Sequence, residues 1–423
     1  MIALVSPSKV SGIIKAPASK SAMQRACALA LIHNGETYLT NAGHSNDDLA
    51  ALDVIQRLGG AVKKIDSNTY LINSGTEHKP ENILDCGESG LGLRMFTPIA
   101  ALNSHEITIT GSGSLMKRPM DFFDMVLPQL GVTIHSNNGK LPLRIKGPLI
   151  ASNITIDGSL SSQFLTGLII SFAASCKVPV TITVVDLKSK PYIDLTLQLM
   201  SHFGWEVSHH NYKEFYFSPS SDKKIRKVSY SVEGDWSGGA FILVAGAIAG
   251  NLTISGLNVN STQADRKILE ALKDAQAKIQ ITGDFIHISG SELHSFEFNA
   301  TDCPDLFPPL VALASICQGE TIIYGVSRLK HKESDRAATL VSEFTKMGVN
   351  IKCEGDTMKI IGSTNLKGCR VDSHHDHRIA MACAVAALRA EDDIEIVNAE
   401  AINKSYPEFF NDLKSINTSL QIL

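Results

Sequence analysis

The sequence predicts an α/β protein of two domains, built from six βαβαββ repeats with three repeats in each domain. Its 423 residues exceed one ordinary domain, and a hydrophobic content of 44% can supply a large core. Short β-branched strands also recur after alanine-rich apolar helices at intervals of roughly 70 residues. Self-similarity at such a period indicates one supersecondary unit that is written several times.

Each repeat contains an apolar helix followed by a short strand. The predicted helices span Met23–Ile32, Leu93–Leu102, Phe164–Cys176, Ala240–Ala249, Leu306–Cys317 and Arg378–Ala390. The strands that follow them span Thr37–Asn41, Ile107–Gly111, Val180–Val184, Leu252–Gly256, Thr321–Gly325 and Ile394–Asn398.

The second half of a repeat is an amphipathic helix that ends near a glycine or a small residue, followed by two strands closed by a turn. These helices are expected at Asp48–Gly59, Asp121–Gly131, Asp194–Gly204, Arg266–Ala275 and Ser334–Gly348. The strand pairs are expected at Ala61–Ile65 with Thr69–Ile72, Val132–His135 with Leu143–Ile145, Trp205–His209 with Glu214–Phe217, Ala277–Ile281 with Phe285–Ile288, and Val349–Lys352 with Met358–Ile361.

The sixth repeat is incomplete, with a helix near Phe409–Ile416 and a single strand near Ser419–Leu423, whereas an additional strand, Val10–Lys15, precedes the first repeat. We therefore expect the N-terminal strand to close the sixth repeat. Residues 1–17 and 233–423 would then form a discontinuous C-terminal domain, with residues 18–232 as an inserted domain. We expect ligands in a cleft between the two domains.

Composition excludes several classes of function. A net charge of −4 and a pI near 6.4 argue against nucleic acid or an anionic membrane as partner. No apolar stretch is long enough to span a bilayer and no export signal is visible, so we expect a cytoplasmic protein. We also expect a monomer. The eight cysteines are scattered singly without a C-x-x-C pair, which predicts neither a zinc site nor disulfides.

Polar residues cluster where the predicted helices begin. Unpaired amides and the helix dipole make such N-termini favourable for phosphate or carboxylate. Serine and aspartate are ordinary capping residues there, but cations in a first turn oppose the dipole. The sequence places five cations in this way: Arg25, Lys332, Arg336, Arg378 and Lys404. Together they predict a local cationic pocket for a substrate with more than one anionic group.

The motifs at these positions resemble those of the 5-enolpyruvylshikimate-3-phosphate synthase family over essentially the whole chain. They are Pro17-Ala-Ser-Lys20-Ser21 with Arg25, Met116-Lys-Arg118-Pro119, Gly158-Ser-Leu-Ser161-Ser162-Gln163-Phe164, Ser189-Lys-Pro191-Tyr192-Ile-Asp194, Glu233-Gly-Asp235, Pro304-Asp305, Lys332-Glu333-Ser-Asp335-Arg336, Asp376-His377-Arg378 and Lys404-Ser-Tyr-Pro407. The resemblance implies the enolpyruvyl transferase fold, an inverse α/β barrel whose domains close over the substrates. It implies transfer of the enolpyruvyl group of phosphoenolpyruvate to shikimate 3-phosphate in the shikimate pathway, without metal or cofactor.

The resemblance also implies roles for individual residues. Shikimate 3-phosphate would be bound by Lys20, Ser21, Arg25, Ser161, Ser162, Ser189, Tyr192, Asp305 and Lys332. Phosphoenolpyruvate would be bound by Lys20, Gly90, Arg118, Gln163, Arg336, Arg378 and Lys404. Asp305 would take the proton from the 5-hydroxyl, and Glu333, with Lys20, would protonate the methylene carbon of the enol.

The residue types suit this chemistry. Addition of an alcohol across an enol double bond needs a base at the hydroxyl and an acid at carbon, and therefore two carboxyl groups in different environments. The surrounding cations would fix the geometry and stabilise the anionic groups. One departure concerns Glu88, in Gly87-Glu88-Ser89-Gly90-Leu91, which would repel a bound phosphate unless its side chain turns away.

Three alternatives remain open at the level of sequence. The nearest is the UDP-N-acetylglucosamine enolpyruvyl transferase of the same fold, whose motifs and larger substrate fit less well. A metal-dependent hydrolase is suggested by His374-His375-Asp376-His377, although adjacent residues at a helix start point in different directions. A non-catalytic anion-binding protein would keep the cationic pocket, but it would not need Asp305 and Glu333.

Overall fold

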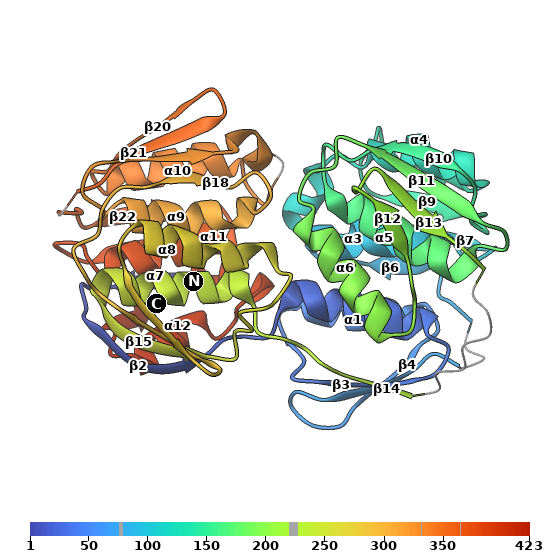
Figure 1. Cartoon of the computed structure of the whole chain (residues 1–423), viewed down its shortest axis with the longest axis horizontal. Helices are drawn as coiled ribbons and strands as arrows, with labels where there is room; N and C mark the ends of the chain where they lie inside the picture. The colour runs from blue at the N-terminus through green and yellow to red at the C-terminus, as the bar shows by residue number, and fades with distance from the viewer. Residues whose placement is uncertain (76–78, 220–226, 331, 364) are drawn as a thin grey trace. The chain divides into compact units, whose positions relative to one another are not determined.

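A computed structural model describes residues 1–75, 79–219, 227–330, 332–363 and 365–423 of the chain (Figure 1). The chain divides into two compact units. Unit 1 consists of Met1–Pro17 and Glu233–Leu423, and unit 2 consists of Ala18–Val232. Among the described helices, none has the length and apolar character needed to cross a membrane.

The described residues of unit 2 form three four-stranded sheets with the same topology. In each sheet the first two strands are parallel and the other pairs are antiparallel. The strand orders are β14 (Lys227–Ser231), β3 (Glu36–Thr40), β5 (Tyr70–Asn73), β4 (Ala61–Lys64); β6 (Ile83–Asp85), β7 (Glu106–Thr110), β9 (Leu143–Lys146), β8 (Thr133–His135); and β10 (Ile154–Asp157), β11 (Val180–Val185), β13 (Glu214–Phe217), β12 (Ser208–His210).

Three buried helices pack against one another in the core of unit 2: α1 (Lys20–Ile32), α3 (Gly90–Ala100) and α5 (Ser162–Ser175). Small residues permit this packing, since a Cβ added to Gly167 of α5 would lie 2.7 Å from the carbonyl oxygen of Met95 in α3. The remaining helical segments of unit 2 are α2 (Asn46–Arg57), η1 (Gly113–Lys117), α4 (Asp121–Val126), η2 (Leu127–Leu130) and α6 (Pro191–His202).

Unit 1 repeats the arrangement with three further four-stranded sheets. Their strand orders are β16 (Lys278–Thr282), β17 (Phe285–Ser289), β15 (Gly250–Ser255), β2 (Val10–Lys15); β18 (Glu297–Asn299), β19 (Glu320–Tyr324), β21 (Thr357–Ile361), β20 (Asn350–Glu354); and β22 (Cys369–Asp372), β23 (Ile394–Val397), β1 (Ile2–Val5), β24 (Leu420–Ile422).

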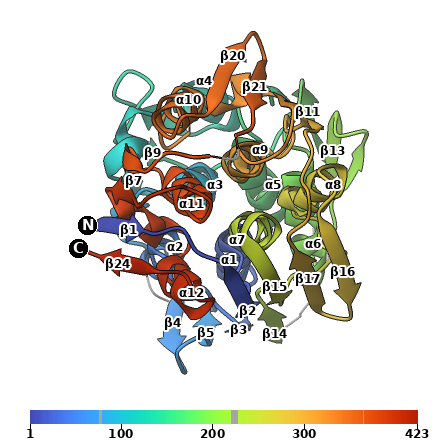
Figure 2. The same cartoon turned by 90° about the vertical axis from the view of Figure 1, so that its left-hand side faces the viewer.

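The helices α7 (Trp236–Ala249), α9 (Phe307–Ala314) and α11 (His377–Ala387) occupy the centre of unit 1, with the sheets around them (Figure 2). Helix α7 is apolar almost all round, as expected for a helix enclosed by other elements. The other helical segments are η3 (Ala264–Lys267), α8 (Ile268–Asp274), η4 (Pro304–Leu306), η5 (Val326–Leu329), α10 (Arg336–Lys346), η6 (Ala399–Lys404) and α12 (Phe409–Ser415).

The N-terminal segment does join the sixth sheet, but the prediction that Val10–Lys15 is the strand that closes it is wrong. That strand, β2, runs parallel to β15 in the fourth sheet. The sixth sheet is completed by β1, which pairs antiparallel with β23 and β24 and buries Ala3 and Val5. A four-residue strand without polar alternation gives little signal in the sequence.

Candidate active site

A cluster of charged side chains in unit 1 surrounds Arg336, the first residue of α10, whose side chain is fully buried. Its Nε donates to Asp376 Oδ2 at 2.9 Å, and its Nη1 donates to Asp305 Oδ1 at 2.9 Å. Its Nη2 donates to Glu333 Oε2 and to Asp376 Oδ1 at 3.2 Å. Burial alone would lower the pKa of Arg336, but the three carboxylates outweigh it and raise the pKa. The guanidinium is therefore permanently charged and fixed in place.

Asp305, in η4, is bound by cations on both carboxylate oxygens. Its Oδ1 accepts from Lys332 Nζ at 3.1 Å as well as from Arg336, and its Oδ2 lies 3.1 Å from Arg378 Nη2. Burial would raise the pKa of this carboxyl, but the charges of Arg378, Lys332 and Arg336 hold it well below its usual range. In this arrangement Asp305 is ionised but a weak base.

The net pKa shifts of the two other cations of the cluster, Lys332 and Arg378, have opposite directions. Burial lowers the pKa of Lys332, with a further decrease from Arg336, although Asp305 opposes both. Burial would also lower the pKa of Arg378, but Asp305 overrides it and the pKa rises. Lys404, the last residue of η6, is 5% exposed, and its Nζ donates to the carbonyl oxygen of His375 at 2.9 Å.

In unit 2, Arg25 is a buried guanidinium bound by neutral oxygens. It donates to Thr196 Oγ1 at 2.8 Å and to the carbonyl oxygens of Ser21 at 2.9 Å and Tyr192 at 3.2 Å. Burial lowers the pKa of Arg25 to about 10. The charge of Arg25 is thus available to attract an anion, and its contacts bring Ser21 and Tyr192 together.

Lys20 opens α1, directly after the capping residue Ser19. Its Nζ donates to Asp47 Oδ2 at 2.8 Å, and both side chains are largely buried. This ion pair directs the ammonium group toward the start of α2.

Gly90 and Arg118 are neighbours at the start of α3, since a Cβ added to Gly90 would lie 2.5 Å from Arg118 Nη1. Arg118 is 7% exposed, and its Nη2 donates to Ser114 Oγ at 3.2 Å. The carboxylate of Glu88 accepts from the backbone N–H of Ser114 at 3.4 Å. The side chain of Glu88 is therefore directed at η1.

The start of α5 holds Ser161, Ser162 and Gln163. Ser161 caps the helix, and its Oγ accepts from the N–H of Gln163 at 3.3 Å. The side-chain oxygen of Gln163 accepts from Arg94 Nη1 at 2.9 Å. Ser162 is the first residue of the helix and is buried, whereas Ser189 lies just before α6 with a left-handed φ of 57°.

The prediction that five cations occupy first helical turns is wrong for three of them. Arg25 lies in the second turn of α1, because this helix begins at Lys20 rather than Met23. Lys332 precedes α10, and Lys404 ends η6. The other two, Arg336 and Arg378, do lie in first turns, and so does Lys20, which was not among the five. Carboxylates beside these three cations offset the unfavourable dipole.

No role in the site was predicted for three residues that organise these clusters: Asp47, Arg94 and Asp376. Asp376 caps α11 by accepting from the N–H of Arg378 at 3.0 Å, while it also binds Arg336. Its place in the Asp-His-Arg motif was a usable signal. Asp47 and Arg94 act through partners distant in sequence, which a single sequence does not reveal.

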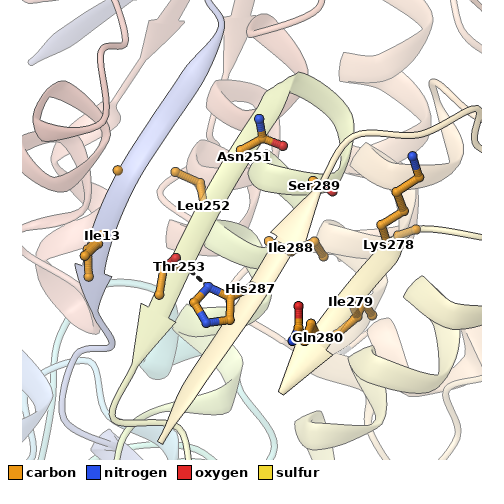
Figure 3. A pocket seen from close by; sticks show the side chains of 12 residues that line it. Ile13, Asn251, Leu252, Thr253, Lys278, Ile279, Gln280, His287, Ile288 and Ser289 are labelled. Atoms are coloured by element: carbon orange, nitrogen blue, oxygen red, sulfur yellow. Dashed lines mark hydrogen bonds between the residues drawn. The ribbon is translucent and has the colours of Figure 1, made fainter. Parts of the chain in front are cut away.

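The described residues contain no group of three or more His, Cys, Asp or Glu side chains placed to hold a metal ion. A hollow of about 840 Å³ lies on the face of the sheet β16-β17-β15-β2, where Ile13, Thr253, Gln280 and His287 line it (Figure 3). None of the candidate site residues lines this hollow.

Residues 4–413 of the chain match the family model described as EPSP synthase (3-phosphoshikimate 1-carboxyvinyltransferase). The chain belongs to this family. A 3-phosphoshikimate 1-carboxyvinyltransferase of Clostridium novyi (strain NT) is 35% identical over 422 residues, which cover 97% of this chain and 96% of the relative. Membership in the EPSP synthase family confirms the main interpretation of the sequence, namely that the protein is a transferase of this family. It favours this interpretation over the three alternatives.

Two solved structures show that the fold is that of the enolpyruvyl transferases. The EPSP synthase of Acinetobacter baumannii aligns with a TM-score of 0.83 at 24% identity, covering 100% of both chains. The enolpyruvyl transferase NikO from Streptomyces tendae aligns with a TM-score of 0.79 at 14% identity, covering 99% of this chain and 98% of its own. At these identities the likeness concerns the fold alone.

Proposed function

We propose that this enzyme transfers the enolpyruvyl group of phosphoenolpyruvate to the 5-hydroxyl of shikimate 3-phosphate and releases phosphate. This reaction belongs to the shikimate pathway, which supplies chorismate and the aromatic amino acids. The observation that carries the proposal is the pair of carboxyl groups, Asp305 and Glu333, held on one buried guanidinium, Arg336. They offer the two proton-transfer groups that addition to an enol requires, beside cations for the anionic substrates.

Residues of both units bind phosphoenolpyruvate in this proposal. Those of unit 1 are Arg336, Arg378 and Lys404, and those of unit 2 are Lys20, Gly90, Arg118 and Gln163. The cations donate charge-assisted hydrogen bonds to the carboxylate and phosphate, each worth about 1.5–3 kcal/mol. The close contact of Gly90 with Arg118 supports a backbone amide and a guanidinium that act on the same anion.

Shikimate 3-phosphate is bound mainly by unit 2, through Lys20, Ser21, Arg25, Ser161, Ser162, Ser189 and Tyr192, with Asp305 and Lys332 from unit 1. Arg25 supports this assignment, because a buried guanidinium whose contacts are neutral oxygens gains most from an anionic ligand.

The reaction is an addition followed by an elimination. Asp305 takes the proton from the 5-hydroxyl of shikimate 3-phosphate as the hydroxyl oxygen bonds to C2 of the enol. Glu333, with Lys20, delivers a proton to C3. The resulting tetrahedral intermediate then loses a proton from C3, and the C2–O bond to phosphate breaks as the double bond forms again. Cations near the departing phosphate stabilise its charge.

Phosphoenolpyruvate and Asp305 compete for the same cations in this mechanism. Both Arg336 and Arg378 bind Asp305 in the structure. When the substrate's anionic groups take hydrogen bonds from these guanidiniums, their effect on Asp305 weakens and its pKa rises. Substrate binding thereby turns a weak base into one that can accept the hydroxyl proton.

We further propose that units 1 and 2 act as the two domains of a cytoplasmic monomer. The acidic net charge and the singly scattered cysteines support this assignment. Six of the eight cysteines are buried, as in proteins that keep their thiols reduced.

Phosphate release from phosphoenolpyruvate tests the proposed function. The wild-type enzyme should release phosphate when shikimate 3-phosphate is the acceptor, and it should keep this activity after treatment with a chelator. UDP-N-acetylglucosamine in place of shikimate 3-phosphate should give no release above background. Release with the nucleotide sugar alone, or activity that requires added zinc, would contradict the proposal.

A further inference from the structure

The segment Asp372–Asp376, here called the 372–376 loop, joins β22 to α11 and contains two consecutive residues with left-handed backbone. His374 has a φ of 52° and His375 a φ of 56°. Residues other than glycine rarely adopt this conformation, and they keep it where surrounding contacts impose it. Within the loop, the N–H of His374 donates to Asp372 Oδ1 at 2.7 Å and the N–H of His375 donates to Ser373 Oγ at 3.1 Å.

This loop carries the attachments of three cations of the candidate site. Asp376 at its end accepts from Arg336 Nε at 2.9 Å, and Arg378 follows in the first turn of α11. The carbonyl oxygen of His375 accepts from Lys404 Nζ at 2.9 Å. A change in the course of the loop would therefore displace all three cations.

Glu343 of α10 holds the beginning of the loop although it contacts none of these cations in the interactions described. It is fully buried, and its Oε2 accepts from the N–H of Asp372 at 2.9 Å. Its Oε1 lies 3.1 Å from His374 Nε2 and also accepts from Ser342 Oγ at 3.0 Å. Lys346 Nζ donates to Oε2 at 2.6 Å from the solvent side.

The carboxylate of Glu343 is suited to this task. Burial would raise its pKa, but the hydrogen bonds from Lys346, Asp372, His374 and Ser342 outweigh burial and lower it. The group stays ionised at neutral pH and accepts hydrogen bonds without donating any.

We propose that Glu343 is a positioning residue, which fixes the 372–376 loop along α10 and so sets the spacing of Arg336, Arg378 and Lys404 for phosphoenolpyruvate. This inference rests on the proposed function. Helix α10 attaches the loop at two points, Arg336 through Asp376 and Glu343 through Asp372 and His374. These two residues lie seven positions apart, or about 10 Å along the helix. Without the second point, the left-handed residues can relax and the cations lose their spacing.

Steady-state kinetics of Glu343→Gln test the proposal. The carboxamide keeps the size of the side chain but loses the charge and one acceptor oxygen. We expect KM for phosphoenolpyruvate to rise about tenfold, while KM for shikimate 3-phosphate and kcat stay within about threefold. The matched control is Lys346→Met, which removes the partially exposed partner of Glu343 and leaves its contacts with the loop. This control should leave both KM values unchanged.

His374→Ala provides a second variant if Glu343→Gln does not fold, since the side chain of His374 is 46% exposed. It should raise KM for phosphoenolpyruvate alone, by about threefold. Unchanged KM for phosphoenolpyruvate in a folded Glu343→Gln enzyme, or a parallel rise of both KM values, would overturn the proposal. If the wild type releases no phosphate, the proposed function fails first, and the inference built on it fails with it.

Discussion

Asp305 binds three cations, Lys332, Arg336 and Arg378, although one would neutralise its charge. Together the three cations keep the carboxyl ionised despite its burial. At the scale of single residues, the proposed mechanism therefore requires Asp305 to accept a proton although these cations lower its pKa.

Lys332→Met should shift the pH dependence of turnover. The charges of Arg378, Lys332 and Arg336 hold the pKa of Asp305 well below its usual range, so removing Lys332 should raise it. A higher pKa means that Asp305 becomes protonated at a higher pH. The acid limb of kcat, measured from about pH 5 to 9 at saturating substrates, should move to higher pH. An acid limb that stays in place would argue against Asp305 as the base.

Gly90→Ala should weaken the binding of phosphoenolpyruvate without unfolding the protein. The new Cβ would lie 2.5 Å from Arg118 Nη1, and this flexible side chain can move away. We expect KM for phosphoenolpyruvate to rise about tenfold, with stability changed by no more than about 0.5 kcal/mol. In an Arg118→Lys background, Gly90→Ala should raise KM for phosphoenolpyruvate by a smaller factor, because Arg118 Nη1 is no longer there to clash with the new Cβ. Equal effects in both backgrounds would contradict the contact.

The sequence indicated most candidate residues but not their partners. Arg336, Arg378 and Asp305 stood in recognisable motifs, and the structure brings them within hydrogen-bonding distance. Asp47, the partner of Lys20, and Arg94, the partner of Gln163, could not be paired from one sequence, because the contacts cross between helices.

At the scale of elements, the core helices α3 and α5 of unit 2 approach one another closely enough to exclude a side chain at some positions. Gly167 is such a position, because a Cβ there would lie 2.7 Å from the carbonyl oxygen of Met95 and 2.8 Å from that of Arg94. Backbone atoms of α3 cannot move away without displacing the helix. The start of α3, where Gly90 and Arg118 meet, depends on this packing.

Gly167→Ala should therefore destabilise unit 2, by about 1–3 kcal/mol for an overpacked core. Urea denaturation followed by circular dichroism would measure the loss. Ser175→Ala, at the half-buried end of the same helix, is the matched control and should change stability by no more than about 0.5 kcal/mol. Equal stability of both variants would contradict the close packing of α3 and α5.

The strand that follows each core helix was predicted, whereas several strands that pair parallel with it were missed. The strand after each core helix was placed to within two residues, since its β-branched residues alternate between buried and exposed. The parallel strands β6 and β18, which have three residues and one buried side chain each, gave no such signal. β1 was missed because its four apolar residues show no polar alternation, and its place was assigned to β2.

At the scale of the whole molecule, the N-terminus completes the last sheet of the chain, so the stability of unit 1 should depend on its first residues. Val5 of β1 is fully buried, whereas Ile13 of β2 is 69% exposed. Val5→Asp should destabilise unit 1 by about 3–5 kcal/mol, because it buries an uncompensated charge. Ile13→Asp is the control and should have little effect.

The two tryptophans of the chain allow this prediction to be measured in each unit, since Trp236 lies in unit 1 and Trp205 in unit 2. In a Trp205→Phe background, fluorescence reports the unfolding of unit 1 through the buried Trp236. If the Val5→Asp variant unfolds at the same urea concentration as the parent protein, this result would contradict the pairing of β1 with β23 and β24.

The proposed function depends most on Asp305 and Lys20, which lie in different units and are both proposed to act in proton transfer. The most direct test is the rate of phosphate release from phosphoenolpyruvate, with saturating shikimate 3-phosphate, for the wild type, Asp305→Asn and Lys20→Ala. We expect each substitution to slow turnover at least about tenfold, or about 1.4 kcal/mol in the activation barrier, in a protein that remains folded. Turnover slowed less than tenfold by both substitutions would contradict the assignment of the site.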